Sequence, residues 1–92
     1  MIARRITIRG RVQGVGYRAW VVEAATLLGV RGWVRNRRDG AVEVFAQGEA
    51  LALESLVSQC RRGPSAARVT GIETLDATPD PALDTFGWRA TE

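Results

Sequence analysis

The sequence predicts a small α+β sandwich, in which a mostly antiparallel sheet carries two helices on one face. Three observations lead to this fold class. Residues 5–12 alternate between apolar and polar side chains, as a half-buried strand does. Residues 18–28 form a long apolar stretch rich in alanine and leucine, and residues 49–62 carry apolar side chains at helical spacing. Between two strand-like stretches the dipeptide Asp39-Gly40 indicates a hairpin, because both residue types tolerate positive φ angles.

The first strand, expected over 5–12, has an apolar side and a polar side. The apolar side consists of Ile6, Ile8 and Val12. The polar side consists of Arg5, Thr7, Arg9 and Arg11. A helix rich in alanine and leucine is expected over 18–28, and Gly29 supplies its C-terminal stop. Two strands over 30–37 and 41–47 would then pair through a two-residue turn.

The second helix is expected over 49–62, and Gly63-Pro64 ends it. Its apolar face consists of Leu53, Leu56, Val57 and Cys60. Two more strands are expected, over 67–76 and 84–89. The order β-α-β-β-α-β, with a possible short fifth strand, is the ferredoxin-like pattern. We therefore expect residues 1–92 to form a single domain.

The amino-acid composition excludes many of the side chains that enzymes commonly use in catalysis. The chain has no histidine, and its 13 basic residues are all arginine. The commonest general base and zinc ligand are therefore missing, and neither a Schiff base nor a phosphate-loop lysine is possible. The single cysteine, Cys60, cannot form an intrachain disulfide, and its place on an apolar helix face predicts a buried thiol. A net charge of +3 favours an anionic partner.

No apolar stretch approaches the roughly 18 residues that a membrane helix needs, and Met1 does not open a signal-peptide pattern. These features predict a cytoplasmic protein with no membrane partner.

One loop carries the strongest functional signal. Its sequence is Gly14-Val15-Gly16-Tyr17-Arg18-Ala19, which fits the dinucleotide-binding pattern G-x-G-x-x-A. A dinucleotide fold is excluded, because it needs a crossover to a parallel strand, whereas a hairpin follows this helix. A single phosphate fits better: the glycines let successive N–H groups converge at a helix N-terminus, and Arg18 adds a planar fork of donors. The alternative is a tight glycine turn with a surface arginine.

Two motifs then resemble the signatures of the acylphosphatase family. The first is Gly10-Arg11-Val12-Gln13-Gly14-Val15-Gly16-Tyr17-Arg18, in which Tyr17 stands where phenylalanine is common. The second is Gly32-Trp33-Val34-Arg35-Asn36, followed by Gly40, Val42 and Gly48. Later segments that resemble the family are Gly63-Pro64, Ala67, Val69 and Phe86. The resemblance covers nearly the whole chain. It implies a ferredoxin-like hydrolase that cleaves the carboxyl–phosphate bond of acyl phosphates without a metal or cofactor.

The resemblance also implies roles for individual residues. Arg18 would bind the substrate phosphate together with the loop amides. These amides belong to Gln13, Gly14, Val15, Gly16, Tyr17 and Arg18. Asn36 would orient the attacking water, and its parity with Val34 predicts that it points to the helix side, where the loop lies. The expected partner is a small acyl phosphate, phosphate or another small anion, and the expected state is a monomer.

Two alternatives stay open at this point. An acylphosphatase-like module that only binds phosphate or carbamoyl phosphate would keep the fold without the activity, although the presence of both Arg18 and Asn36 argues against it. An RNA platform is the other alternative, because one sheet parity carries Arg5, Arg9, Arg11, Arg31, Trp33 and Arg35. The RNA-recognition fingerprint is not met, so we expect a solvated face with a partly packed Trp33 and no nucleic-acid partner.

Overall fold

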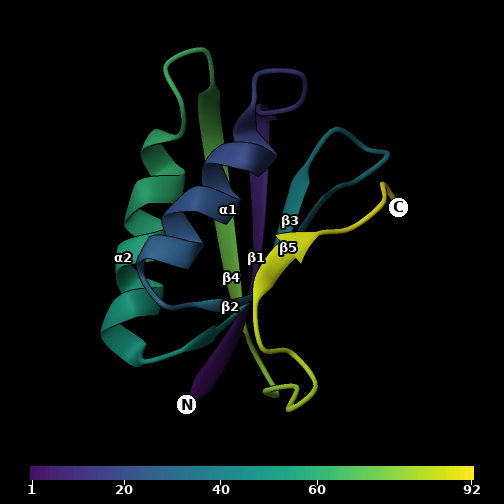
Figure 1. Cartoon of the computed structure of the whole chain (residues 1–92). Coiled ribbons are helices and arrows are strands. Elements are labelled where there is room, and N and C mark those ends of the chain that lie inside the picture. Colours follow the sequence, from purple (N-terminus) through teal and green to yellow (C-terminus); the bar gives the residue numbers. More distant parts are fainter.

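A computed structural model covers residues 1–92 and forms a two-layer sandwich of one sheet and two helices (Figure 1). The elements are β1 Ile2–Arg11, α1 Tyr17–Leu27, β2 Arg31–Asn36, β3 Val42–Gly48, α2 Ala50–Arg62, β4 Arg68–Ala77 and β5 Phe86–Trp88. The predicted order β-α-β-β-α-β is confirmed, and the possible fifth strand is present as the three-residue β5.

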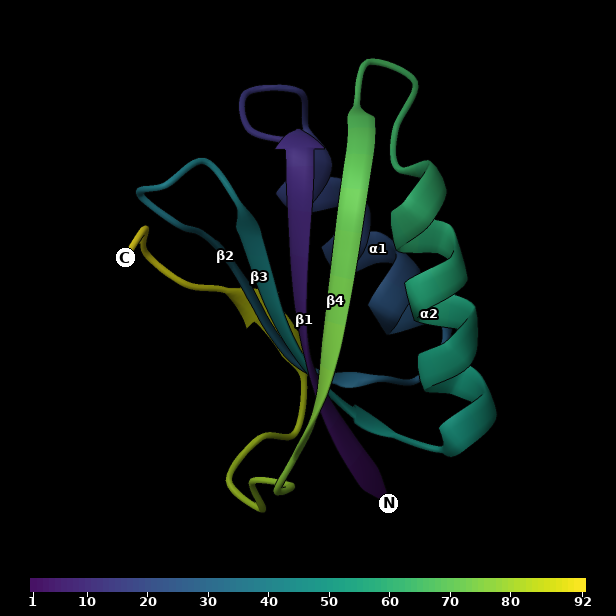
Figure 2. The ribbon, with the colours of Figure 1, turned by 180° about the vertical axis from the view of Figure 1, so that it is seen from behind.

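The strands lie in the order β4-β1-β3-β2-β5. All neighbouring strands are antiparallel except β2 and β5, which run parallel. Both helices cover the same face of the sheet, and the view from behind shows β1 and β4 in front of α1 (Figure 2). This is the ferredoxin-like α+β arrangement that the sequence predicts.

The core lies between the helices and the sheet. The apolar side of β1 faces it as predicted, since Ile6 and Ile8 are both 0% exposed. Register places Ile6 opposite Val44, and Val44 opposite Val34, so one apolar row crosses the three central strands. The helices contribute Val21, Leu53, Leu56 and Cys60 to the same cluster. Each such side chain stabilises the fold by about 1.5–3 kcal/mol when it is fully buried.

Cys60 is a buried free thiol, as its position on the apolar face of α2 predicts. Burial raises the pKa of this thiol to about 11. The thiolate is therefore scarce at neutral pH, and Cys60 is a packing residue of the core.

The hairpin between β2 and β3 differs from the predicted two-residue turn. The Arg37 N–H donates to the Ala41 carbonyl at 2.8 Å, and the Gly40 N–H donates to the Arg37 carbonyl at 3.1 Å. Three residues therefore form the loop, and only Gly40 has a positive φ, at 98°. The Asp39 carboxylate explains the longer loop, because its Oδ1 accepts the Ala41 N–H at 3.0 Å and so replaces a second left-handed residue.

The face opposite the helices is more covered over β2 and β3 than the solvated surface with a partly packed Trp33 that the sequence predicts. Trp33 is only 7% exposed and stacks on Phe45 with ring centroids 6.0 Å apart. Arg35 and Arg89 lie over the Trp33 ring at 4.7 and 4.8 Å. The indole is covered, so the exposed stacking platform that single-stranded RNA binding needs is missing here.

Arginines on this face also surround a buried carboxylate. Glu43 is 7% exposed and accepts hydrogen bonds from Arg5 at 2.6 Å and from Arg35 at 2.7 Å. Burial opposes the charge of Glu43, but the bonds from Arg35 and Arg5 outweigh that effect and lower the pKa of this carboxyl. Arg5 and Arg35 thus take part in an ion-pair network around Glu43.

Candidate active site

The loop between β1 and α1 forms one side of the candidate site. Gly14 and Gly16 have φ angles of 73° and 78°, and no residue other than glycine has a positive φ in this chain. A Cβ atom added at either glycine would meet nothing within 4 Å. Backbone conformation therefore requires these glycines, and the space beside them is open to a ligand.

The loop presents a row of unpaired backbone donors. None of the N–H groups of residues 13–16 donates a hydrogen bond to another backbone group. The first helical hydrogen bond runs from the Trp20 N–H to the Gly16 carbonyl at 3.1 Å. Gly16 is the N-cap of α1, which has no side-chain cap and no acidic residue in its first turn. Consecutive free N–H groups at an uncapped helix N-terminus attract an anion.

The Gln13 side chain attaches this loop to the β2–β3 hairpin. Its Nε2 donates to the carbonyl of Arg37 at 2.7 Å and to that of Ala41 at 2.9 Å. Both of its N–H donors are thereby used, so Gln13 can contribute only its backbone N–H to a ligand. The two bonds also hold the loop beside the end of β2.

Tyr17 belongs to the core by its side chain and to the loop by its backbone. The ring is 1% exposed, and its hydroxyl donates to the Cys60 carbonyl at 2.6 Å. Burial, together with Cys60, raises the pKa of Tyr17, so the phenol stays protonated. Tyr17 therefore anchors the first turn of α1 against α2.

Replacing Tyr17 with phenylalanine, the residue common at this position in the family, should lower the free energy of unfolding by about 1 kcal/mol, the typical net value of one hydrogen bond. The activity should stay within about two-fold of wild type, because the backbone N–H is unchanged. Urea denaturation and steady-state kinetics check these values. Thr70→Val, which removes an exposed hydroxyl without a hydrogen bond, is the control and should not lower stability. A ten-fold loss of activity in the Tyr17 variant would contradict the anchoring role.

Arg18 projects from the first turn of α1 and is partly buried. Its guanidinium carbon lies 4.6 Å from the centre of the Trp88 ring on β5. Arg18 takes part in none of the seven ion pairs of the chain, and its side chain donates no hydrogen bond. All five N–H donors of the guanidinium are therefore available to a phosphate.

Asn36 is the last residue of β2, and its row on the sheet faces the helices. Register places Asn36 opposite Val42, and Val42 opposite Ile8, both of which are core residues. This orientation agrees with the parity of Asn36 in the sequence. The side-chain Oδ1 is buried and has no hydrogen-bond partner. An unpaired buried amide oxygen costs about 1–3 kcal/mol, and such groups concentrate at functional sites.

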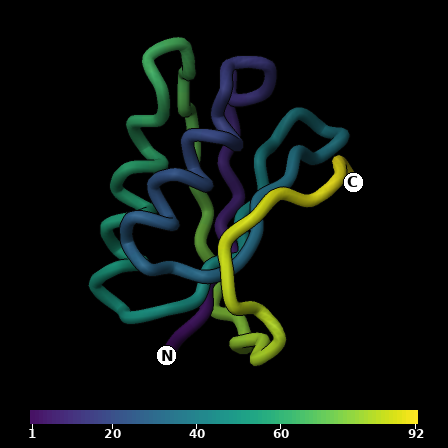
Figure 3. The backbone as a smooth tube through the Cα atoms, viewed as in Figure 1, coloured from purple at the N-terminus to yellow at the C-terminus, as the bar shows by residue number.

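The C-terminal segment fixes the end of β2 from the other side. The Glu92 N–H donates to the Asn36 carbonyl at 3.1 Å, and the Arg38 N–H donates to the Glu92 carbonyl at 3.1 Å. Figure 3 shows this segment, in yellow, running beside the β2–β3 hairpin. The backbone that carries Asn36 is thus held between the loop, through Gln13, and the C-terminus.

The side chains that commonly bind metals do not cluster in this chain. No group of three or more histidine, cysteine, aspartate or glutamate residues lies together in the chain. The predicted site residues supply backbone N–H groups, one guanidinium and one amide. This set suits the binding of a phosphoryl group and the positioning of a water.

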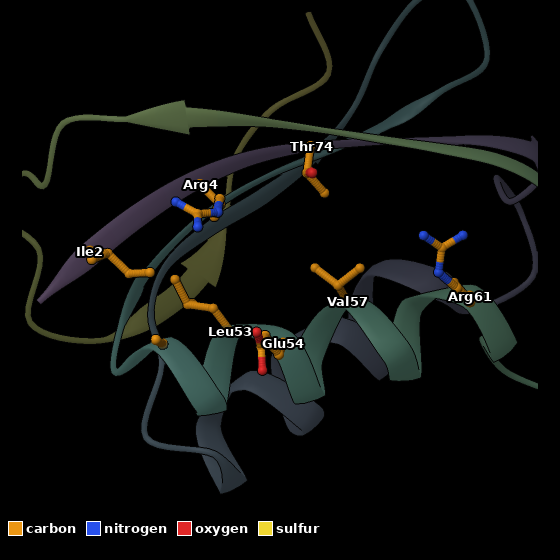
Figure 4. Close-up of a pocket in the computed structure, with 8 residues that line it drawn as sticks. Ile2, Arg4, Leu53, Glu54, Val57, Arg61 and Thr74 are labelled. Carbon is orange, nitrogen blue, oxygen red and sulfur yellow. The ribbon is translucent and has the colours of Figure 1, made fainter.

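The candidate site does not coincide with a deep cavity. A groove of 260 Å³ lies elsewhere, between α2 and the β1–β4 pair (Figure 4). Ile2, Leu53 and Val57 form its apolar part, and Arg4, Glu54 and Arg61 lie around it. A cradle formed by backbone N–H groups is shallow, because the donors themselves are its surface. Neither helix is long and apolar enough to cross a membrane.

The sequence predicts Arg18, Asn36 and the loop as site residues, but it does not point to Trp88. The parallel pairing of β5 with β2 places Trp88 opposite Val34, on the helix side next to α1. In the sequence Trp88 is one aromatic residue within the strand expected over 84–89, and nothing there indicates its contact with Arg18.

Comparison with known proteins shows the family of this chain. The family model described as Acylphosphatase matches residues 4–87. An acylphosphatase of Rhodopseudomonas palustris is 53% identical over 90% of this chain and 83% of its own length. One of Acidiphilium cryptum is 50% identical over 99% of both chains. The crystal structure of acylphosphatase from Bacillus subtilis superposes with a TM-score of 0.92 and 37% identity, covering 97% of this chain and 99% of that one. The chain therefore belongs to the acylphosphatase family of hydrolases.

Proposed function

We propose that this acylphosphatase hydrolyses small acyl phosphates by attack of a water on a phosphoryl group held by loop residues 13–18 and Arg18, with Asn36 orienting the water. One observation carries the proposal: the run of unpaired backbone N–H groups begins at Gln13 and leads directly to Arg18, whose guanidinium stacks on Trp88 and makes no ion pair. Such a set of donors matches the oxygens of a phosphoryl group.

Binding would use the backbone and the guanidinium together. The N–H groups of the loop and of the first turn of α1 donate to the phosphoryl oxygens, and the positive end of the helix dipole adds to the attraction. Arg18 donates two parallel hydrogen bonds to a pair of these oxygens. In the transition state of phosphoryl transfer, negative charge is spread over the phosphoryl oxygens. The donors that bind these oxygens therefore also stabilise the transition state.

Asn36 would hold the nucleophile. Its buried Oδ1 has no hydrogen-bond partner, and the two Gln13 hydrogen bonds attach the loop to the hairpin that follows Asn36. The amide can therefore bind a water beside the phosphoryl group and fix its direction of attack. The rate enhancement would then come mainly from the orientation of this water and not from a general base.

The chemistry needs few groups, because an acyl phosphate is already activated. The water oxygen forms a bond to phosphorus, while the bond between phosphorus and the acyl oxygen breaks and its electron pair leaves with the carboxylate. A phosphate oxygen of the substrate accepts the proton of the water. The products are a carboxylate and inorganic phosphate, and no side chain has to protonate the leaving group.

We also propose that residues 1–92 act as a single domain. One cluster of 17 buried residues supports this, because it includes side chains of β1, β2, β3, β5 and both helices. The monomeric state and the cytoplasmic location stay predictions from the sequence.

The test is release of inorganic phosphate from benzoyl phosphate in the presence of EDTA. We expect turnover at the same rate with and without EDTA, and turnover of acetyl phosphate as well. An aryl phosphate monoester should react at least about 100-fold more slowly, because its more basic leaving group needs a general acid that this site lacks. Loss of turnover in EDTA would contradict the proposal. Phosphate binding without any turnover would indicate a module that binds phosphate only.

A further inference from the structure

Trp88 makes the shortest of the five cation–π contacts in the protein. The guanidinium of Arg18 lies 4.6 Å from its ring centre, whereas the other four contacts range from 4.7 to 5.9 Å. Those four involve Trp33 and Phe45 on the opposite face of the sheet. Trp88 is 53% exposed, so its ring is reached by solvent as well as by Arg18. It is thus the one aromatic ring that meets the arginine of the candidate site.

Pairing with β2 and a further backbone hydrogen bond fix the position of the short strand that carries Trp88. Register pairs Gly32 with Phe86 and Val34 with Trp88, so both aromatic residues of β5 face the helix side. Phe86 is 8% exposed and belongs to the main core, and the Arg89 N–H donates to the Val34 carbonyl at 2.9 Å. The indole therefore stands at a defined position beside the first turn of α1.

We propose that Trp88 is a positioning residue that holds the Arg18 guanidinium ready for the phosphoryl group. The inference rests on the role of Arg18 in the proposed function. A carboxylate would also hold an arginine in place, but it would occupy N–H donors and neutralise the charge, as Glu43 does for Arg35. An indole face attracts the cation through its quadrupole and leaves the in-plane donors free.

The stack should act on affinity more than on turnover. An arginine side chain has many rotamers, and ordering it when the ligand binds costs free energy. Trp88 orders the guanidinium beforehand, so phosphate and substrate both bind more tightly. The bound complex and the transition state are stabilised by the same amount. KM and the inhibition constant of phosphate are therefore lowered, while kcat is nearly unchanged.

The experiment compares Trp88→Ala, Trp88→Leu and Trp88→Phe with benzoyl phosphate as substrate and inorganic phosphate as inhibitor. The alanine and leucine variants should raise KM and the inhibition constant together by about five-fold, with kcat within about two-fold of wild type. Phenylalanine retains a ring face and should keep both constants within about two-fold of wild type. Leu75→Ala is the matched control, since Leu75 is 66% exposed on β4, the other edge strand, and should change nothing.

Several results would overturn the inference. Unchanged constants in Trp88→Ala would do so, and so would equal behaviour of the leucine and phenylalanine variants, which would indicate packing alone. The effect of Trp88→Ala must also disappear when Arg18 is already alanine; an equal effect there would show that Trp88 acts independently. If Arg18→Ala itself keeps full activity, the proposed function fails and the inference with it. If Arg18→Ala is inactive while Trp88→Ala is normal, only the inference fails.

Discussion

Replacing Arg18 with alanine should lower kcat/KM for benzoyl phosphate by about 1,000-fold or more, the range found when an arginine that stabilises a transferring phosphoryl group is lost. The guanidinium stacks on the Trp88 ring but makes no ion pair, so its removal breaks no ion pair and leaves no buried charge behind. The loss therefore falls on ligand binding rather than on folding. Both the affinity for phosphate and the turnover should decrease, because the same donors serve the bound ligand and the transition state.

Steady-state kinetics, phosphate titration and thermal unfolding of each variant check this prediction. Arg62→Ala is the control for the loss of one positive charge, since Arg62 is exposed at the end of α2 and makes no ion pair. Its activity should stay within about two-fold of wild type. Arg18→Lys keeps the charge but not the planar fork, so it should recover only part of the activity. Wild-type kinetics in Arg18→Ala would remove Arg18 from the site.

Replacing Asn36 with alanine should lower kcat by about 100- to 1,000-fold, as the loss of one positioned polar group in an active site does. Affinity for inorganic phosphate should change by less than about three-fold, because the loop amides and Arg18 remain. Stability should not fall and should rise by about 1 kcal/mol, since the variant removes a buried amide oxygen that has no partner. A loss of activity combined with a gain in stability distinguishes a functional residue from a structural one.

Asn36 is the only asparagine in the chain, so the control is a glutamine. Gln59→Ala removes an amide from α2 that makes no side-chain hydrogen bond, and its kcat should equal that of wild type. Phosphate titration separates the two roles in the site. A large loss of phosphate affinity in Asn36→Ala would place Asn36 among the binding groups and contradict its role with the water.

The helices followed most closely from the sequence. The first was expected over 18–28 and lies at Tyr17–Leu27, because Gly29 with a φ of 71° ends it. The Gly29 N–H donates to Thr26 and the Val30 N–H to Ala25, which is the Schellman pattern of a glycine stop. A helix end of this kind depends only on a few neighbouring residues, so it can be predicted from the sequence.

Features of the sheet were harder to predict. β1 begins at Ile2, three residues before the expected start, because pairing with both β3 and β4 extends it past the region of clear alternation. Trp33 has the parity of an outward residue, yet Arg35 and Arg89 cover it. Parity tells which face of the sheet a residue occupies, but not what lies on that face.

The sequence by itself determined the order of the elements and predicted Arg18, Asn36 and the loop as the candidate site. Gly14 and Gly16 indicate a backbone conformation with positive φ that other residues rarely adopt. The alternation of side chains along β2 predicted that Asn36 points to the helix side of the sheet. Only the tertiary structure decided that Gln13 binds the hairpin and that Arg18 stacks on Trp88. These contacts join distant parts of the chain: the first depends on the pairing of β1 with β3 and the second on the pairing of β5 with β2, and no local pattern encodes either pairing.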